Sequence, residues 1–460
     1  MFLQRVVIAA VFAAALAGCT AGPTARAPAA MTEAQASELA ERVKAETRHA
    51  WQGYVRYAWG HDALKPLTRA PHDWYGPSLL MTPVDALDTL LLMGLTDEAK
   101  QAQELIASKL SFDHDVDVQV FEVTIRLLGG LITGYQMTGD TRLLALADDL
   151  GRRLMPAFAS RTGLPYRYVN LRTGKVRDGI SNPAETGTLL LEFGMLGKLA
   201  GKPAYYDAAK RALVETYRRR STIGLVGSQI DVETGAWTNP SAHIGGGIDS
   251  YYEYLYKCWR LFGDADCKRM WDDSIGPVNR YLADEVRDGE LWYGRADMNT
   301  GQRTITRYGA LDAFMPALLA LGGDVDRAAR LQASGMTMWR PHGIEPDAYD
   351  SAAQNVLRPT YPLRPVLVES AYYLHRLTGK PQYRAMGKEL FDDFVRWCRT
   401  EDGYAALKDV TTKERDDAME SFLFAETFKY FYLLFAPRDA FDFDAATFNT
   451  EAHPLRLPVP

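Results

Sequence analysis

Residues 200–213 read AGKPAYYDAAKRAL, and residues 378–390 read TGKPQYRAMGKEL. In both stretches an apolar segment ends at Gly-Lys-Pro, and a second segment of mixed charged and apolar residues begins at once. Glycine often ends a helix in the left-handed conformation, and proline is favoured at the first position of the next helix. The repeated stretch therefore predicts two helices joined by a tight turn.

The same helix–glycine–helix pattern recurs along the chain, at spacings of 45 to 62 residues. The glycines that mark it are Gly94, Gly139, Gly201, Gly263, Gly323 and Gly379. A last copy, LFAPRDAF, has Pro437 in place of the glycine. Seven such hairpins predict an all-α fold.

The two segments of each hairpin differ in their polarity. First segments such as DALDTLLLMGL and SYYEYLYKCWRLF are apolar on most faces, which is typical of buried helices. Second segments such as DEAKQAQELIASKL are amphipathic. Buried inner helices ringed by amphipathic outer helices predict an (α/α)7 barrel. An open solenoid is the alternative, but it would need caps at both ends of its apolar layer.

The first residues are expected to be a processing signal. Arg5 precedes an apolar run over residues 6–15, and Leu-Ala-Gly leads to Cys19. This pattern resembles the lipobox of bacterial lipoproteins, in which the cysteine is lipidated; an ordinary secretory signal is the alternative. The predicted organisation is a lipoprotein-type signal peptide (1–18), a flexible tether (19–35) and one barrel domain (36–460). The expected location is the bacterial cell envelope, periplasmic or at the outer membrane, with membrane contact only through a lipid on Cys19.

The composition indicates a globular protein. Hydrophobic residues make up 47% of the chain and charged residues 24%, and the net charge of −6 argues against nucleic acid as a partner. We expect a monomer. Beyond Cys19 the cysteines are Cys258, Cys267 and Cys398, and three thiols cannot all pair. Whether Cys258 and Cys267 form a disulfide stays open at this point.

Carboxylates recur near the N-terminal ends of the predicted inner helices. They are Asp85, Asp88, Glu122, Glu185, Asp249, Glu253, Glu369, Glu420 and Glu426. One such acid could be a helix cap, but a carboxylate in six of seven repeats is not explained by capping. In a barrel the same ends of all inner helices face one cavity, so we expect these acids to line it. Glycoside hydrolysis requires two carboxyl groups, which favours carbohydrate chemistry.

Helical spacing places some of these acids beside partners. Glu122 and Arg126 are four residues apart, so they can pair on one face of a helix. Phe422 and Glu426 have the same spacing and put a ring beside a carboxylate, an arrangement that suits a sugar. Near the C-terminus, Thr450 offers a hydroxyl and a carbonyl oxygen. A hard cation such as Ca²⁺ prefers oxygen ligands of this kind.

Several longer motifs occur in order from residue 50 to 456. They are TPVDALDTLLLMGL, FEVTIRLLGGLITGYQMTGD, ETGTLLLEF, DSYYEYLYK, YPLRPVLVES, ESFLFAETFKYFYLLF and FNTEAHPLR. With these motifs the chain resembles glycoside hydrolase family 47, the class I α-1,2-mannosidases. The resemblance implies an (α/α)7 barrel plugged by its C-terminal tail. It also implies Ca²⁺-dependent, inverting removal of terminal α-1,2-linked mannose from mannose-containing oligosaccharides.

The same resemblance implies roles for individual residues. Glu122 matches the general acid, which acts through a water, and Asp249 matches a second acid near the scissile bond. Thr450 matches the Ca²⁺ ligand. The residues that match substrate-binding positions are Asp88, Arg126, Glu185, Arg364, Phe422, Glu426 and Glu451.

One position departs from the family. The family motif is Arg-Pro-Glu-x-x-Glu-Ser and its first glutamate is the general base, but residues 364–370 read RPVLVES, so Val366 stands there. Valine cannot take a proton, and loss of a general base costs about 10²–10⁴-fold in rate. Glu369, one turn further on, is the third catalytic candidate, and Asp249 is another group that could compensate.

Two functions follow from this departure. The chain is either a hydrolase that uses another base, or a mannose-binding relative with weak or no hydrolysis. A terpene-cyclase-like barrel is a third possibility, raised by the two acids of DALDTL, but the sequence has no aspartate-rich metal motif.

Overall fold

The computed structural model describes residues 31–457, apart from 287 and 288. The predicted signal peptide, the lipidation site at Cys19 and most of the predicted tether lie outside the described residues. No helix in the described part of the chain combines the length and apolarity that a membrane span requires.

The first helix begins earlier than the sequence suggested. Helix α1 spans Glu33–Ala58, so the prediction that the tether extends to residue 35 is wrong at its end. Thr32 caps this helix: its hydroxyl accepts from the backbone N–H of Gln35 at 3.2 Å, and the Gln35 side chain accepts from the backbone N–H of Thr32 at 2.9 Å. This reciprocal capping box stabilises the helix start.

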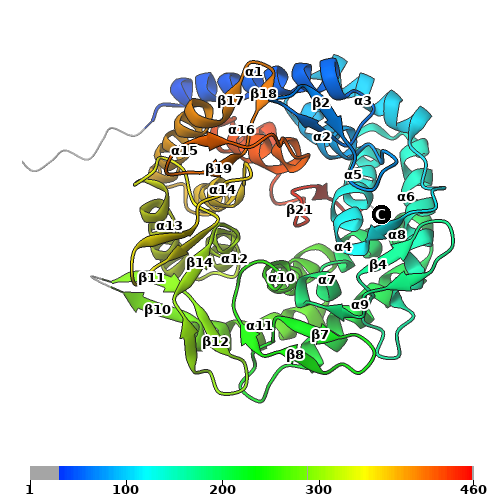
Figure 1. The fold of residues 1–460 in the computed structure, drawn as a ribbon, viewed down its shortest axis with the longest axis vertical. Helices are drawn as coiled ribbons and strands as arrows, with labels where there is room; N and C mark the ends of the chain where they lie inside the picture. The colour runs from blue at the N-terminus through cyan, green and yellow to red at the C-terminus, as the bar shows by residue number, and fades with distance from the viewer. Residues whose placement is uncertain (1–30, 287–288, 458–460) are drawn as a thin grey trace, which may run out of the picture. The chain divides into compact units, whose positions relative to one another are not determined.

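Two concentric layers of helices make up the described chain (Figure 1). The inner layer contains α2 (Met81–Leu92), α5 (Gly129–Thr138), α8 (Leu190–Ala200), α10 (Asp249–Phe262), α12 (Met315–Leu321), α14 (Val366–Thr378) and α16 (Phe428–Phe435). The outer layer contains α1, α3 (Thr96–Lys109), α6 (Thr141–Leu154), α9 (Pro203–Arg218), α11 (Ala265–Tyr281), α13 (Val325–Trp339) and α15 (Gln382–Cys398). The predicted (α/α)7 barrel is confirmed.

The glycines of the repeat have the predicted conformation. Gly139, Gly201, Gly263 and Gly379 end α5, α8, α10 and α14 with φ between 67° and 74°. Gly94 and Gly323 follow the other inner helices with φ of 65° and 95°. Glycine adopts this region without steric cost, which is why the turn sequence marks the hairpins so clearly.

The seventh hairpin differs from the prediction. Helix α16 ends at Phe435 and is followed by a single short turn, η5 (Arg438–Ala440), rather than by an outer helix. Helix α1, from the other end of the chain, packs against α16 instead, and Figure 1 shows the blue α1 beside the orange α16. The ring is therefore closed by the first and last helices of the described chain.

Inner helices begin irregularly at several places. Short segments precede the regular helices α5, α8, α12 and α16: they are α4 (Val120–Val123), η1 (Thr124–Leu128), α7 (Pro183–Gly187), η3 (Ala310–Phe314) and η4 (Leu423–Thr427). Two of them, η1 and η4, are wider π-helical turns that contain Arg126 and Glu426. Turns of this kind are frequent at functional sites.

Short antiparallel strands lie in the connections that lead from outer to inner helices and in the C-terminal tail, and the sequence did not predict them. Four three-stranded sheets are formed by β3 (Asp117–Gln119), β4 (Tyr168–Asn170) and β5 (Val176–Arg177); β6 (Ile180–Ser181), β7 (Gln229–Asp231) and β8 (Trp237–Asn239); β9 (Ser241–Ala242), β12 (Arg295–Asp297) and β13 (Arg303–Ile305); and β14 (Arg307–Gly309), β15 (Ala348–Asp350) and β16 (Asn355–Arg358). Two-stranded pairs are β1 (Ala63–Lys65) with β2 (Ala70–His72), β10 (Ala283–Val286) with β11 (Glu290–Tyr293), β17 (Arg399–Thr400) with β18 (Gly403–Tyr404), β19 (Leu407–Asp409) with β20 (Glu414–Arg415), and β21 (Thr447–Phe448) with β22 (Pro454–Leu455).

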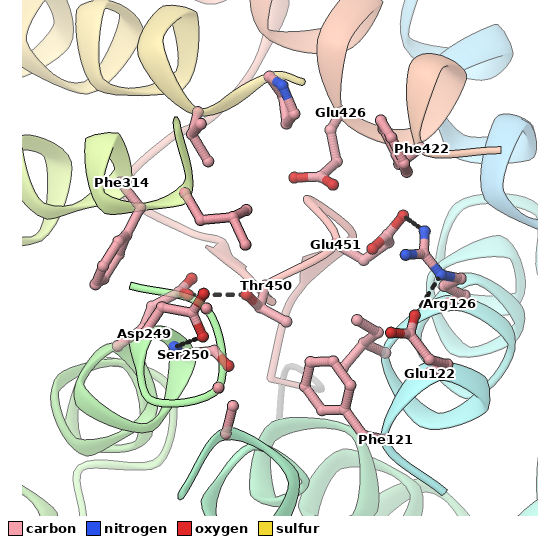
Figure 2. A pocket seen from close by; sticks show the side chains of 18 of the residues that line it. Phe121, Glu122, Arg126, Asp249, Ser250, Phe314, Phe422, Glu426, Thr450 and Glu451 are labelled. Atoms are coloured by element: carbon pink, nitrogen blue, oxygen red, sulfur yellow. Dashed lines mark hydrogen bonds and ion pairs between the residues drawn. The ribbon is translucent and has the colours of Figure 1, made fainter. Parts of the chain in front are cut away.

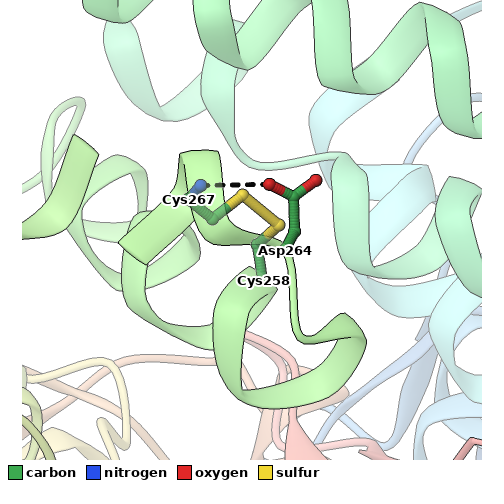
Figure 3. A group of neighbouring side chains, drawn as sticks. All are labelled: Cys258, Asp264 and Cys267. Carbon is green, nitrogen blue, oxygen red and sulfur yellow. Dashed lines mark hydrogen bonds between the residues drawn. A yellow bond between two sulfur atoms is a disulfide. The ribbon is translucent and has the colours of Figure 1, made fainter. Parts of the chain in front are cut away.

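A disulfide joins an inner helix to its outer partner. Cys258 in α10 is bonded to Cys267 in α11 (Figure 3). Asp264 caps α11 beside it, accepting from the backbone N–H of Cys267 at 3.2 Å. The pairing that the sequence left open is thus present, and Cys398 is buried as a free thiol.

Candidate active site

A cavity of about 300 Å³ lies inside the ring, where the N-terminal ends of inner helices meet the C-terminal tail (Figure 2). Its wall is rich in acids. The carboxylates that line it belong to Glu122, Glu185, Asp249, Glu253, Glu369, Glu426 and Glu451. Only two arginines, Arg126 and Arg364, line the cavity with them. The prediction that the acids of the repeats share one cavity therefore holds for six of these side chains, whereas Glu451 comes from the tail. It does not hold for Asp85, Asp88 and Glu420, which are not among the residues that line this cavity.

The C-terminal tail enters the ring as a hairpin of β21 and β22 (Figure 1). Asn449 holds the loop of this hairpin: its side-chain amide donates to the Ile125 carbonyl and to Glu192, each at 2.8 Å. Its side-chain oxygen accepts from the backbone N–H groups of Glu451 at 2.9 Å and His453 at 2.8 Å. These contacts fix the loop that carries Thr450 and Glu451 into the cavity.

Beneath this loop lies a fully buried ionic cluster. Asp88 accepts from the Lys429 ammonium at 2.9 Å, and its carboxylate lies 3.1 Å from His453 Nδ1. Lys429 also donates to the Ala452 carbonyl at 2.6 Å. Asp88 does not line the cavity, so its predicted role in contacting substrate is not supported by its position. It anchors the tail instead.

Arg126 connects the tail to the wall of the cavity. Its guanidinium group donates to Glu122 at 3.0 Å and to Glu451, as Figure 2 shows. The rings of Trp74 and Phe422 lie 5.2 and 5.7 Å from the guanidinium carbon. The predicted Glu122–Arg126 pair is confirmed, and its ion pairs and cation–π contacts hold both carboxylates in place.

Glu185 is held from several sides. Arg167 donates to its two oxygens at 2.7 and 2.9 Å, a two-pronged contact that fixes the plane of the carboxylate. Gln119 and Ser181 each donate to it at 2.9 Å. The sequence pointed to Glu185 but to none of these three supporting residues, because they come from strands and turns with no fixed spacing to it.

Thr450 lies beside a buried acid–base pair. Its hydroxyl donates to Glu253 at 2.9 Å, and Lys257 donates to the other oxygen of Glu253. Lys257 is four residues after Glu253 in α10, so helical spacing could have revealed this pair from the sequence. Lys257 thus balances one acid within a wall that is otherwise strongly acidic.

Burial raises the pKa of several acids in the cavity. It raises the pKa of Asp249 to about 6, although the backbone N–H of Ser250 donates to Asp249 at 2.9 Å and opposes the shift. Burial and the charge of Glu253 raise the pKa of Glu369 to about 8, and Tyr430 donates to Glu369 at 3.2 Å. For Glu426, burial and the charge of Glu369 also raise the pKa. At neutral pH Asp249 is therefore mainly ionised and Glu369 mainly protonated.

Val366 lines the same cavity. It is the first residue of α14, two residues after Arg364, and its exposed fraction is 7%. Its apolar side chain occupies this position of the wall, while Glu369 lies one turn further along the helix. The first position of α14 thus presents an apolar side chain to the cavity, and Glu369 is the carboxylate of its first turn.

The cavity suits a hard cation. Thr450 places its hydroxyl there, and within residues 31–457, 287 and 288 aside, no hydrogen bond to the Thr450 carbonyl is found. In that same part of the chain, Cys258, Asp264 and Cys267 are the only three His, Cys, Asp or Glu side chains whose ligand atoms converge within 4.8 Å, and both sulfurs are in the disulfide. The acids of the cavity therefore form no tight cage, and a Ca²⁺ ion held by Thr450 would take most of its six to eight oxygens from water and sugar.

Comparison with known proteins agrees with this geometry. The model of glycosyl hydrolase family 47 matches residues 46–457. The chain is 36% identical over 456 residues to "ER degradation-enhancing alpha-mannosidase-like protein 2" of Mus musculus, covering 90% of this chain and 77% of the relative. It is 36% identical over 451 residues to "Mannosyl-oligosaccharide 1,2-alpha-mannosidase IB" of Homo sapiens, covering 91% and 70% of the two chains.

A solved structure matches the fold closely. The α-1,2-mannosidase from Trichoderma reesei superposes with a TM-score of 0.84 at 28% identity, and the match covers 92% of this chain and 99% of that one. The chain therefore belongs to glycosyl hydrolase family 47 and is a glycoside hydrolase related to the α-1,2-mannosidases. The predicted resemblance is confirmed over nearly the whole described chain.

Proposed function

We propose that this protein is a Ca²⁺-dependent, inverting exo-α-1,2-mannosidase that removes terminal α-1,2-linked mannose from glycans. The observation that supports it best is the convergence of seven carboxylates with Thr450 of the tail in one cavity of about 300 Å³. Two similar proteins whose names state α-1,2-mannosidase activity support the linkage and the sugar.

Within the proposal, Thr450 holds the calcium ion through its carbonyl and hydroxyl oxygens. A Ca²⁺ ion bound there would offer positive charge to the hydroxyls of the terminal sugar. The other residues contact the substrate directly: the Phe422 ring packs against an apolar sugar face, and Arg364, Glu185 and Glu426 meet its hydroxyls. Because all of these side chains line the cavity, one terminal mannose can reach them together.

The proposed chemistry uses three carboxyl groups. Glu122, held by Arg126, delivers a proton to the leaving oxygen through a water. Asp249 takes the proton from the attacking water, because it is ionised at neutral pH whereas Glu369 mainly is not. Glu369, protonated, donates a hydrogen bond into the site. This assignment supplies the base that Val366 cannot provide.

A substrate panel tests the proposed function. Purified protein is incubated with α-1,2-, α-1,3- and α-1,6-linked mannobiose, and free mannose is measured with Ca²⁺, with EDTA, and with EDTA followed by excess Ca²⁺. We expect mannose from the α-1,2-linked disaccharide alone, loss of activity in EDTA and its recovery with Ca²⁺. Ca²⁺-dependent binding of the disaccharide with no release of mannose would contradict hydrolysis and support a mannose-binding role.

We also propose that the protein resides in the bacterial cell envelope, anchored by a lipid on Cys19. The charged, apolar and small residues before Cys19 support this location. Fractionation of cells that express the full chain tests it. The parent should be found with the membranes and a Cys19→Ser variant in the soluble fraction; equal membrane association of both would contradict the anchor.

A further inference from the structure

A second cavity, of about 190 Å³, adjoins the active-site cavity. The two cavities share Gly246, Leu311 and Arg364, so one oligosaccharide can extend from the first into the second. Much of the second wall comes from strands outside the inner helices, including Arg295 at the start of β12 and Arg307 at the start of β14. These strands belong to two different sheets, which hold the two arginines on rigid backbone.

The second cavity is rich in positive charge. Four arginines line it, namely Arg295, Arg307, Arg358 and Arg364, against two acids, Asp312 and Asp347. Asp347 is already engaged: one oxygen accepts from Arg364 at 3.0 Å and the other from Arg358 at 3.3 Å. Asp312 accepts from the backbone N–H of Gly309. Neither acid forms an ion pair with Arg295 or Arg307.

These two arginines stand out from their neighbours. No ion pair or hydrogen bond to the guanidinium group of Arg295 or Arg307 is found in the part of the chain that the structure describes, yet both are partly buried. Arg303 in the adjoining β13 pairs with Asp284. Arg330 in α13 pairs with Glu285 at 2.8 Å. The bare guanidinium groups are thus a property of this cavity, not of the whole region.

The positive charge of these arginines shifts the pKa of neighbouring groups. Burial together with Arg295 and Arg307 lowers the pKa of the buried His243 to about 3. Burial and the nearby Arg307 also lower the pKa of Arg295, and the charge of Asp312 only partly opposes this shift. Placing like charges together in a partly dry site is unfavourable unless a counter-charge joins them. An anion in the second cavity would supply that counter-charge.

We propose that the second cavity binds an anionic substituent, a phosphate ester or a carboxylate, carried by the sugar next to the terminal mannose. The planar guanidinium fork donates two parallel hydrogen bonds to either oxyanion, and Arg295 and Arg307 both have their forks free. The enzyme would then prefer acidic mannose-containing glycans to neutral ones. This inference rests on the proposed α-1,2-mannosidase function.

Matched substrates test the inference. The probes are α-1,2-mannobiose, the same disaccharide with a 6-phosphate on its reducing-end mannose, and the same with a carboxylate at C6 of that residue. For the parent we expect kcat/KM to be about tenfold or more higher on at least one acidic probe, as charge-assisted arginine contacts produce. The Arg295→Gln/Arg307→Gln double variant should lose this preference and keep its rate on the neutral disaccharide. Arg330→Gln, a matched loss of arginine charge outside the cavity, should retain the preference.

Two results would overturn the inference. One is an equal kcat/KM for neutral and acidic probes in the parent; the other is a double variant that loses activity equally on all three. If no probe is hydrolysed, the proposed function has failed independently of this inference. The anion site is then tested by calorimetry, which compares the binding of mannose 6-phosphate with that of mannose. Tighter binding of the phosphate by the parent but not by the double variant supports the anion site, and equal binding of both sugars removes it.

Discussion

Val366 stands where the resemblance to the family leads us to expect the general base. It is the first residue of α14, and negative charge is favourable at a helix N-terminus by about 0.3–1 kcal/mol. A glutamate there would face the cavity. We predict that Val366→Glu raises kcat on α-1,2-mannobiose by about 10²-fold, the usual contribution of a general base. Val366→Gln, of equal size but unable to take a proton, is the control; an equal gain in both variants would refute the explanation.

Asp249 is the general base in the proposed mechanism. Burial raises its pKa to about 6, so the ionised form that accepts a proton is lost as the pH falls through that value. We predict that kcat/KM declines on the acid side with a midpoint near pH 6, and that Asp249→Asn lowers kcat by about 10²–10⁴-fold. Glu369→Gln should cost less, because Glu369 is already mainly protonated at neutral pH. A larger loss in Glu369→Gln would transfer the role of base to that residue.

Residues with a fixed helical spacing were the ones that the sequence could reveal. Glu122 and Arg126 pair as predicted, and Glu253 with Lys257 followed the same rule. The sequence could not predict that Arg167 donates hydrogen bonds to Glu185, or that His453 lies beside Asp88. Their contacts depend on how separate elements pack, and no local pattern encodes that.

Among the elements, the C-terminal hairpin does most to build the site. Burial opposes the charge on His453, but Asp88 and Asp85 outweigh it and raise the pKa of His453 to about 9. Because this pKa lies above the ordinary value of 6.5, the stabilisation is complete below pH 6.5 and is lost as the pH rises through 9. We predict that Tm falls between pH 7 and 9.5 in the parent, and falls less in His453→Gln.

The control for this prediction is a histidine outside the tail. His114, in the connection between α3 and β3, is replaced by glutamine, and its pH profile of Tm should follow that of the parent. Equal slopes in the parent and in His453→Gln would contradict the role of His453 in holding the hairpin.

Helices were predictable and strands were not, for a physical reason. Inner helices such as α8 and α10 are apolar over three to four turns and end at Gly201 and Gly263, so the apolar pattern and the turn residue indicate the same helix. The strands are only two to four residues long and lie in connections. Such short stretches show neither a clear alternation of polar and apolar residues nor a marked β-propensity. These strands nevertheless supply Arg295 and Arg307, so the second cavity could not be predicted from the sequence.

At the scale of the whole molecule, the two ends of the barrel meet. Seven inner helices need seven outer partners, and α1 supplies the one that the chain lacks after α16. The sequence predicted seven hairpins from spacing alone, but it assigned the last outer helix to the wrong end, because a hairpin repeat says nothing of how a ring closes. Helix α1 covers α16 together with α14 and α15.

This closure predicts the effect of truncation. A chain that begins at residue 31 should unfold at the same temperature as the processed protein, because it keeps α1 and its Thr32 cap. A chain that begins at residue 59 exposes the outer face of α16 and should fail to fold or should aggregate. Circular dichroism during heating measures both. A stable chain without α1 would show that the ring does not depend on its closure.

The proposed enzyme completes an inverting, Ca²⁺-dependent hydrolysis in spite of Val366. Proton NMR of the first minutes of α-1,2-mannobiose cleavage tests it most directly, because inversion of an α-linkage releases β-mannose before mutarotation. We predict that the β-anomer appears first with Ca²⁺ and that no mannose appears in EDTA. Initial release of α-mannose would contradict inversion, and equal turnover in EDTA would contradict the dependence on Ca²⁺.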